Sequence, residues 1–194
     1  MIPLTVKGRS NIVARFSAGY RSAMSAVRHA SFTPYVAPDT RLLILGSLPG
    51  ARSLAERQYY AHPTNQFWRL VGAVIDKPLA EREYPARLAM LRAAKIGLWD
   101  VIRTAQRRSS SDSDIREADP HDLAGLIATL PALRMIAFNG GTAAAIGRRQ
   151  LSMLDGVTAV DLPSSSAANT RSFSAKQEQW WQLRQALVDD SSSL

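Results

Sequence analysis

The sequence predicts a three-layer α/β/α sandwich with a central, mostly parallel four-stranded sheet. Three observations lead to this fold class. The chain has 194 residues, which is long enough for one domain with a sizeable core. Four short apolar runs are bounded by glycine, proline or polar residues, as buried parallel strands are. Segments with apolar residues at helical spacing separate these runs, and this alternation predicts βαβ units with helices on both faces of the sheet.

The first predicted strand covers residues 42–45 and ends at Gly46. The other three strands are predicted at residues 96–102, 133–138 and 157–162. Ligands of such sheets bind beyond the carboxyl ends of the strands. We therefore expect four polar segments to meet at one edge of the sheet and form a site: the loop at Gly46, Asp100, Asn139 and the loop at Ser164.

Helices are predicted where apolar residues recur every three or four positions. The clearest is the segment that begins near Phe67, where Leu70, Val71 and Val74 follow at helical spacing. Further helices are predicted at residues 79–94, 123–130, 142–149 and 175–188. Residues 104–113 show no periodicity and are predicted to form a polar loop, whose Arg107 and serines either hold phosphates or are simply solvated.

The predicted domain covers residues 32–188. Residues 1–31 contain no acidic residue and are predicted to be a basic, weakly ordered extension, with a transit peptide and a DNA-binding arm as alternatives. Residues 189–194 are predicted to be a frayed tail. No apolar run has the length of a membrane span, so we expect no membrane association. We expect a cytoplasmic monomer that joins the nucleoid when it binds DNA.

The composition narrows the function classes. There is no cysteine, which excludes disulfides, cysteine-ligated iron–sulfur clusters and thiolate zinc sites, and three histidines make a multi-histidine metal site improbable. We therefore expect no metal and no cofactor. Lys and Arg number 24 against 16 Asp and Glu, a net charge of +8 that favours a polyanionic partner, nucleic acid first.

The segment 42–68 combines stacking groups, amide donors and backbone N–H groups, a mixture that suits a nucleobase. It contains no Walker A sequence, because no Gly-Lys-Ser/Thr follows Gly50, and the chain has no Gly-x-Ser-x-Gly elbow. A triad of Ser47, His62 and Asp100 can be drawn, but any chain with many serines permits one. Asn139 is either part of a tight turn or a buried amide that offers both a donor and an acceptor.

Six short blocks carry a family resemblance, and the longest reads Tyr-Tyr-Ala-His-Pro-Thr-Asn-Gln-Phe-Trp at residues 59–68. The others are Gly-Ser-Leu-Pro-Gly at 46–50, Gly-Leu-Trp-Asp-Val-Ile at 97–102, Ser-Asp-Ser at 111–113, Phe-Asn-Gly-Gly at 138–141 and Leu-Pro-Ser-Ser-Ser at 162–166. By these blocks the sequence resembles the uracil-DNA glycosylase superfamily, and most closely its hypoxanthine-DNA (deoxyinosine) glycosylase branch. The resemblance covers the chain from about residue 32 to the last helix.

The resemblance implies a DNA repair enzyme that flips out a deaminated base and hydrolyses its N-glycosidic bond, with double-stranded DNA as its partner. Hypoxanthine is the expected base, with uracil and xanthine as further candidates. The mismatch-specific relatives carry a catalytic Asn at the position of Leu48, and other uracil enzymes carry a His in the last block, near Ser164. Both are missing here, as expected of the deoxyinosine branch, where the resemblance places the catalytic amide at Asn65.

The remaining roles follow from the same comparison. Base-binding residues are expected at Tyr60, Asn139, Ser47 and Gly46, with Tyr60 offering a stacking face unless it only packs beside Phe67. Loop and DNA-backbone contacts are expected at His62, Ser164, Ser165, Ser166, Asn169 and Arg171. His62 is expected to organise its loop rather than to catalyse. Two alternatives stay open: a non-catalytic DNA-binding protein on the same scaffold and, more distantly, a serine hydrolase.

Overall fold

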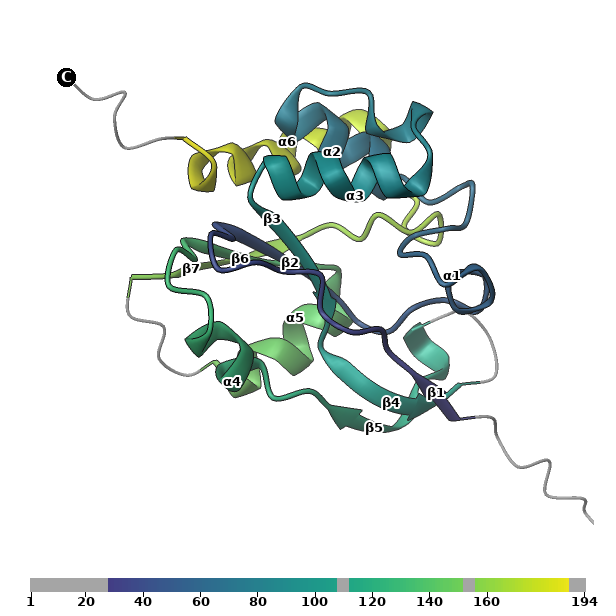
Figure 1. Ribbon diagram of the computed structural model, residues 1–194. Helices are drawn as coiled ribbons and strands as arrows, with labels where there is room; N and C mark the ends of the chain where they lie inside the picture. Colours follow the sequence, from purple (N-terminus) through teal and green to yellow (C-terminus); the bar gives the residue numbers. More distant parts are fainter. Residues whose placement is uncertain (1–27, 108–111, 152–155, 189–194) are drawn as a thin grey trace, which may run out of the picture.

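The computed structural model describes residues 28–107, 112–151 and 156–188 (Figure 1). In this part of the chain the middle layer is a parallel sheet of four strands in the order β3-β2-β6-β7. The strands are β2 (Leu42–Gly46), β3 (Ile96–Asp100), β6 (Met135–Asn139) and β7 (Thr158–Leu162). The predicted four-stranded parallel sheet is therefore confirmed.

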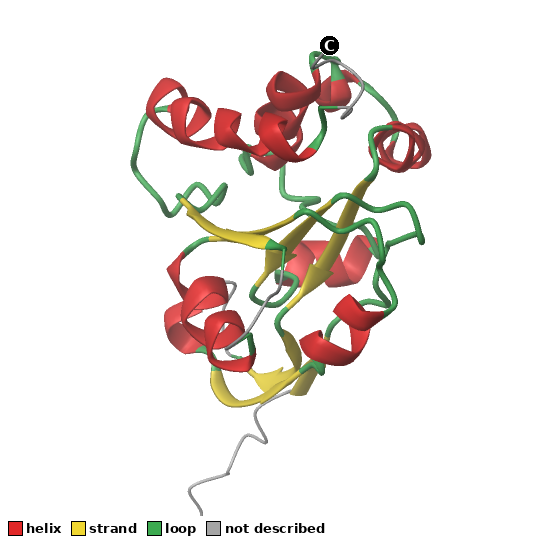
Figure 2. Cartoon of the chain, turned by 90° about the vertical axis from the view of Figure 1, so that its left-hand side faces the viewer, coloured by secondary structure: helices red, strands yellow, loops and turns green. Residues whose placement is uncertain are grey.

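Helices cover both faces of this sheet (Figures 1 and 2). One layer holds α2 (Phe67–Ile75), α3 (Tyr84–Ala93) and α6 (Phe173–Trp180), together with the 3-10 segments η1 (Leu79–Glu81) and η4 (Trp181–Ala186). The opposite layer holds α4 (Leu123–Ala128) and α5 (Gly141–Gly147), which continues into η3 (Arg148–Gln150). The three-layer α/β/α prediction is confirmed.

Strand β2 shows why the sequence of a central strand is apolar throughout. Its residues Leu42 and Ile44 belong to the core beneath α2 and α6, whereas Leu43 and Leu45 belong to the core on the opposite face. All four side chains are 0% exposed. Burying each contributes about 1.5–3 kcal/mol, so neither face of this strand tolerates a polar residue until Gly46 reaches the edge of the sheet.

A second sheet was missed by the sequence analysis. Strands β1 (Arg28–Ala30), β4 (Ile102–Gln106) and β5 (Arg116–Pro120) pair antiparallel in the order β1-β4-β5. The predicted strand 96–102 is therefore two strands that meet at Val101, and the predicted polar loop 104–113 begins as β4 and ends in η2 (Asp112–Asp114). These strands are short and largely polar, so the sequence contains no apolar run that would predict them.

The helix predictions need three corrections. The helix predicted at 79–94 is broken into η1 and α3, and Pro85 lies in the first turn of α3, where its missing N–H costs nothing. The helix predicted at 175–188 tightens into η4 after Trp180. A further short helix, α1 (Ala51–Glu56), lies in the segment expected to be a loop.

The chain ends also differ from the prediction. Residues Arg28–Ala30 form β1 and pair with β4, so the weakly ordered extension cannot reach residue 31. Residues 1–27, the predicted tail 189–194 and residues 108–111 and 152–155 lie outside the described residues. Within the described part of the chain, no helix has the length and apolar character needed to cross a membrane.

Candidate base-excision site

A cavity of about 640 Å³ opens at the carboxyl ends of the central strands. The loop after β2, the segment 59–65, the ends of β3 and β6 and the loop after β7 line it. The polar segments that were expected to meet at this edge, those of Gly46, Asp100, Asn139 and Ser164, all contribute to the lining. The structure thus confirms that one edge of the sheet gathers them.

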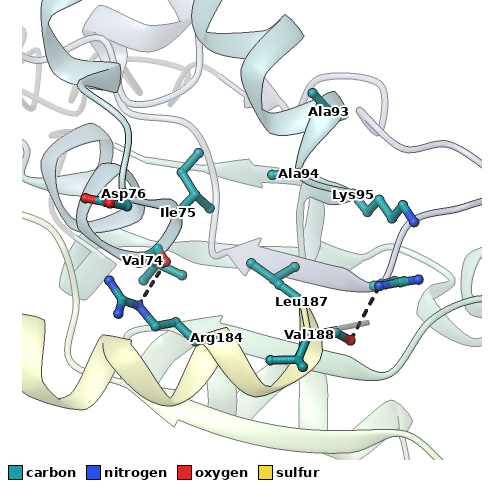
Figure 3. A pocket seen from close by; sticks show the side chains of 10 residues that line it. Val74, Ile75, Asp76, Ala93, Ala94, Lys95, Arg184, Leu187 and Val188 are labelled. Carbon is teal, nitrogen blue, oxygen red and sulfur yellow. Dashed lines mark hydrogen bonds between the residues drawn. The ribbon is translucent and has the colours of Figure 1, made fainter. Parts of the chain in front are cut away.

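A second hollow of about 470 Å³ lies at the other end of the strands, beside Arg41 and Lys95 (Figure 3). Its two arginines already bind backbone carbonyls of the fold: Arg184 Nε donates to Val74 O at 3.0 Å and Arg41 Nη1 donates to Val188 O at 3.5 Å. Ligands of parallel sheets bind at the carboxyl ends of the strands. We therefore assign the site to the 640 Å³ cavity.

Asn65 lines this cavity in the turn that precedes α2. Its Oδ1 accepts a hydrogen bond from Phe67 N at 2.9 Å, which fixes the orientation of the amide. Its Nδ2 donates to none of the residues that the structure describes. The side chain therefore keeps two N–H donors and one lone pair of Oδ1 for a water or a ligand.

His62 holds the turn that leads to Asn65. Its Nδ1 lies 2.8 Å from Thr64 Oγ1 and accepts from Thr64 N at 3.3 Å, and its carbonyl accepts from Asn65 N at 2.9 Å. These contacts within the loop are consistent with the expected role of His62 in organising it, which stays a prediction. The conceivable serine-hydrolase triad does not form, because Ser47 Oγ donates to Asp112 Oδ1 at 2.7 Å instead of meeting His62.

Tyr60 packs in the core and also lines the cavity, and its expected role as a stacking face for the base stays a prediction. Its ring stacks on Phe67 with centroids 3.7 Å apart and an interplanar angle of 13°, yet the residue also lines the cavity. One face of the ring is therefore occupied by the core. Burial raises the pKa of the Tyr60 hydroxyl group, so this group stays protonated. It has no hydrogen-bond partner of normal geometry among the described residues.

Asn139 and Ser165 form a reciprocal pair at the cavity wall. Asn139 Nδ2 donates to Ser165 Oγ at 2.9 Å, and Asn139 Oδ1 accepts from Ser165 N at 2.8 Å. The Ser165 carbonyl accepts from Gln66 N at 2.9 Å. Ser165 thus connects the end of β6 with the segment that carries Asn65.

This pairing corrects the expectation that Ser165 grips a DNA phosphate. Ser165 is only 1% exposed, so its hydroxyl faces Asn139 rather than the surface. Its neighbours Ser164 and Ser166 are partly exposed and accept from the backbone N–H groups of Ser166 and Ala168, both at 3.2 Å. Those turns leave the outer side of the loop exposed.

Lys176 supports this loop from below and was not expected from the sequence. The side chain lies in the first turns of α6 and is fully buried. Its Nζ donates to Ser166 O at 3.2 Å and to Asn169 O at 2.9 Å, and burial lowers its pKa. Arg171 is exposed just beyond the loop, where its backbone N–H donates to Asn169 Oδ1 at 3.1 Å.

Asp100 was expected at this edge of the sheet, but no catalytic or base-binding role was predicted for it. It ends β3, lines the cavity and is 3% exposed. Burial raises its pKa from the ordinary 3.8 to about 7, and the hydrogen bond from Ser31 Oγ to Oδ2, 2.9 Å long, opposes that rise. A Cβ on Gly46 would lie 2.8 Å from Asp100 Oδ1 and 3.1 Å from the Tyr60 hydroxyl, so only glycine fits there.

The position that is catalytic in the mismatch-specific relatives holds Leu48, whose side chain is 6% exposed and belongs to the core shared with Trp99 and Phe138. Leu48 therefore offers the cavity its backbone only. No cluster of histidine, cysteine, aspartate or glutamate that could hold a metal occurs among the described residues. The polar side chains that line the cavity include the amides of Asn65 and Asn139, hydroxyl groups and the buried carboxyl group of Asp100.

The chain belongs to the uracil DNA glycosylase superfamily, whose family model matches residues 33–187. It is 42% identical over 144 residues to a hypoxanthine DNA glycosylase from Methanosarcina acetivorans, which is 74% of this chain and 89% of the relative. It is 36% identical over 154 residues to a hypoxanthine DNA glycosylase from Methanosarcina barkeri, covering 79% of this chain and 96% of the relative.

The fold has a solved counterpart in the same superfamily. The solution NMR structure of a candidate uracil DNA glycosylase from Methanosarcina acetivorans superposes with a TM-score of 0.74 at 37% sequence identity. The match covers 82% of this chain and 99% of that chain. The resemblance read from the sequence blocks is thereby confirmed.

Proposed function

We propose that this chain is a monofunctional DNA glycosylase that flips a deaminated base, hypoxanthine first, out of double-stranded DNA and hydrolyses its N-glycosidic bond. The observation that carries the proposal is the placement of Asn65, Asn139 and Asp100 around one cavity at the edge of the sheet. The relatives named as hypoxanthine DNA glycosylases support hypoxanthine as the base. The product is an abasic site in otherwise intact DNA.

The positive charge of the protein attracts DNA, and the loop after β7 contacts the duplex beside the cavity. The net charge of +8 attracts the phosphate backbone. The exposed loop residues Ala167 and Ala168, and Arg171 beside them, then approach the duplex. Taking a base out of the stack costs a few kcal/mol, and less when the base is mispaired, as hypoxanthine is opposite thymine. The enzyme therefore gains selectivity before any bond breaks.

The flipped base is recognised by the amide and carboxyl groups of the cavity wall. Asn139 keeps one N–H and one lone pair beyond its bonds to Ser165. Hypoxanthine presents O6 and N1–H where adenine presents an exocyclic amino group and an unprotonated N1. A site built to hydrogen-bond the deaminated pattern leaves polar groups unpaired when adenine enters, and such mismatches discriminate strongly.

Bond cleavage needs no cofactor. As the C1′–N bond of the sugar breaks, its electron pair stays on the base and positive charge develops on the sugar. A water held by the free lone pair of Asn65 Oδ1 then adds to C1′; its oxygen and one hydrogen stay on the sugar as a hydroxyl group, and the departed base takes up one proton, so that one water is consumed. An amide is a weak base, so Asn65 contributes by positioning the water, and stabilisation of the developing charges supplies the rest.

The test is base release from a set of duplex oligonucleotides, each with one hypoxanthine, uracil or xanthine, and one with adenine at the same position. We expect free hypoxanthine and an abasic site from the hypoxanthine duplex at the highest rate, and no release of adenine. Failure to release any of the three deaminated bases would leave only the DNA-binding alternative.

A further inference from the structure

The loop after β2 turns its carbonyl groups away from the cavity. Gly46 O accepts from Val101 N at 2.8 Å, and Ser47 O accepts from Ile102 N at 3.1 Å. Both donors belong to the junction between β3 and β4. The first half of the loop is therefore fixed by the backbone of the neighbouring strands.

A buried arginine fixes the second half of the loop. Arg107 Nη1 donates to Leu48 O at 3.4 Å, and its Nη2 donates to Pro49 O. The residue is 4% exposed, so it is neither solvated nor available to a DNA phosphate, the two roles that the sequence suggested. Burial lowers the pKa of the guanidinium while Asp112 and Asp100 raise it, and arginine stays charged in such surroundings.

These bonds determine where the loop's N–H groups point. In a trans peptide the N–H lies opposite the carbonyl of the preceding residue, and the described residues contain no cis peptide. The N–H groups of Ser47, Leu48 and Gly50 therefore point away from Arg107 and the β3–β4 junction. All three residues line the cavity, and none of these N–H groups donates to another described residue.

We propose that Arg107 is a positioning residue for base release, which holds Pro49 O so that the Gly50 N–H faces the departing base beside the Ser47 and Leu48 N–H groups that the β3–β4 junction orients. This inference rests on the proposed glycosylase function. The electron pair of the broken C1′–N bond makes the base anionic as it leaves, and preorganised N–H donors with a buried cation behind them stabilise that charge. No carboxylate of the described residues lies within ion-pair distance of Arg107, so its charge is not neutralised by a direct partner.

The test compares Arg107→Met, which keeps the length but loses the charge, with Arg107→Lys, which keeps the charge but loses the two-armed geometry. We expect the single-turnover rate of hypoxanthine release to fall about 10²-fold in Arg107→Met, the usual effect of losing a preorganised donor. Arg107→Lys should recover part of that loss. DNA affinity, measured with an uncleavable duplex, should stay within about threefold of wild type, because Arg107 does not reach the surface.

Arg184 offers a matched control (Figure 3). Like Arg107 it donates to two backbone carbonyls, from Nε to Val74 O at 3.0 Å and from Nη2 to Ala73 O at 2.7 Å, but it lies at the opposite end of the sheet. Arg184→Met should lower the melting temperature and leave the release rate per folded molecule unchanged.

The outcomes separate the two proposals. Wild-type protein that releases no base refutes the glycosylase function itself. If the wild type is active and both Arg107→Met and Arg107→Lys release the base at the wild-type rate per folded molecule, only the role of Arg107 is refuted. Should Arg107→Met fail to fold, the rate of Arg107→Lys tests the proposal. A rate equal to that of the wild type would show that the two-armed geometry of the guanidinium is unimportant and would refute the role of Arg107.

Discussion

Replacing Asp100 with asparagine should stabilise the protein, and more so as the pH rises. The carboxyl group is 3% exposed, and burial raises its pKa from 3.8 to about 7. The folded state therefore holds a proton that the unfolded state releases near pH 4. Unfolding consequently becomes easier as the pH rises through this window. Asparagine keeps an oxygen for the Ser31 hydroxyl, which donates at 2.9 Å, and carries no charge to bury.

The magnitude follows from the two pKa values. The stabilisation held by the protonated Asp100 is fully present below pH 4, and it is lost as the pH approaches 7. Each factor of ten in the acid equilibrium corresponds to about 1.4 kcal/mol. The free energy of unfolding of wild type should therefore fall relative to Asp100→Asn by about 3 kcal/mol between pH 4.5 and pH 8.

Urea denaturation of both proteins across this pH range measures the difference. Asp161→Asn is a suitable control, because Asp161 is an exposed carboxylate that pairs with Arg148 at 2.9 Å and should change stability by less than about 1 kcal/mol. A difference between wild type and Asp100→Asn that does not change with pH would refute the argument that Asp100 is protonated by burial.

Two further substitutions test the loop after β7. Gly140→Ala should destabilise the protein by about 1–3 kcal/mol, because the backbone has φ +103° and a Cβ would lie 3.0 Å from Ser164 Cβ; thermal unfolding measures this, and an unchanged melting temperature would contradict it. Lys176→Met removes the ammonium group that donates to Ser166 O and Asn169 O, so DNA affinity should fall several-fold while the rate of hypoxanthine release at saturating enzyme changes little. Fluorescence anisotropy measures the affinity, and a single-turnover assay measures the rate. An unaltered affinity would show that the loop holds its shape without Lys176.

The central sheet was predictable because its strands are buried on both faces. Such strands must be apolar at every position, as Leu42 and Leu43 show from opposite faces. The second sheet gives no comparable signal. Strand β4 alternates buried Ile102 with exposed Arg103, and its partner β1 lies more than 70 residues earlier, with Arg28 opposite Gln106. Long-range pairing of short polar strands cannot be read from local pattern.

The site was predictable where chemistry is local to a motif. Asn65 and Asn139 stand in specific sequence blocks, and the structure brings both to the cavity. Lys176 and Arg107 were misjudged or missed because charged residues are almost always exposed, and only the fold shows that these two are buried. Asp100, an acidic residue at the end of an apolar strand, was expected at the site on that signal, but its burial and its raised pKa follow only from the fold.

Asn65 is the residue through which the whole account is most directly tested. The decisive measurement is the single-turnover rate of hypoxanthine release from a duplex with one deoxyinosine, for wild type and Asn65→Ala, alongside the affinity of each protein for an uncleavable duplex. Asn169→Ala is the matched control, since Asn169 Oδ1 also accepts a backbone N–H, from Arg171 at 3.1 Å, at the outer rim of the cavity.

We expect Asn65→Ala to lose the rate by about 10²–10³-fold while its DNA affinity stays within about threefold of wild type and Asn169→Ala keeps its rate. Equal rates for wild type and Asn65→Ala would contradict the assignment of the water-positioning amide to the segment before α2.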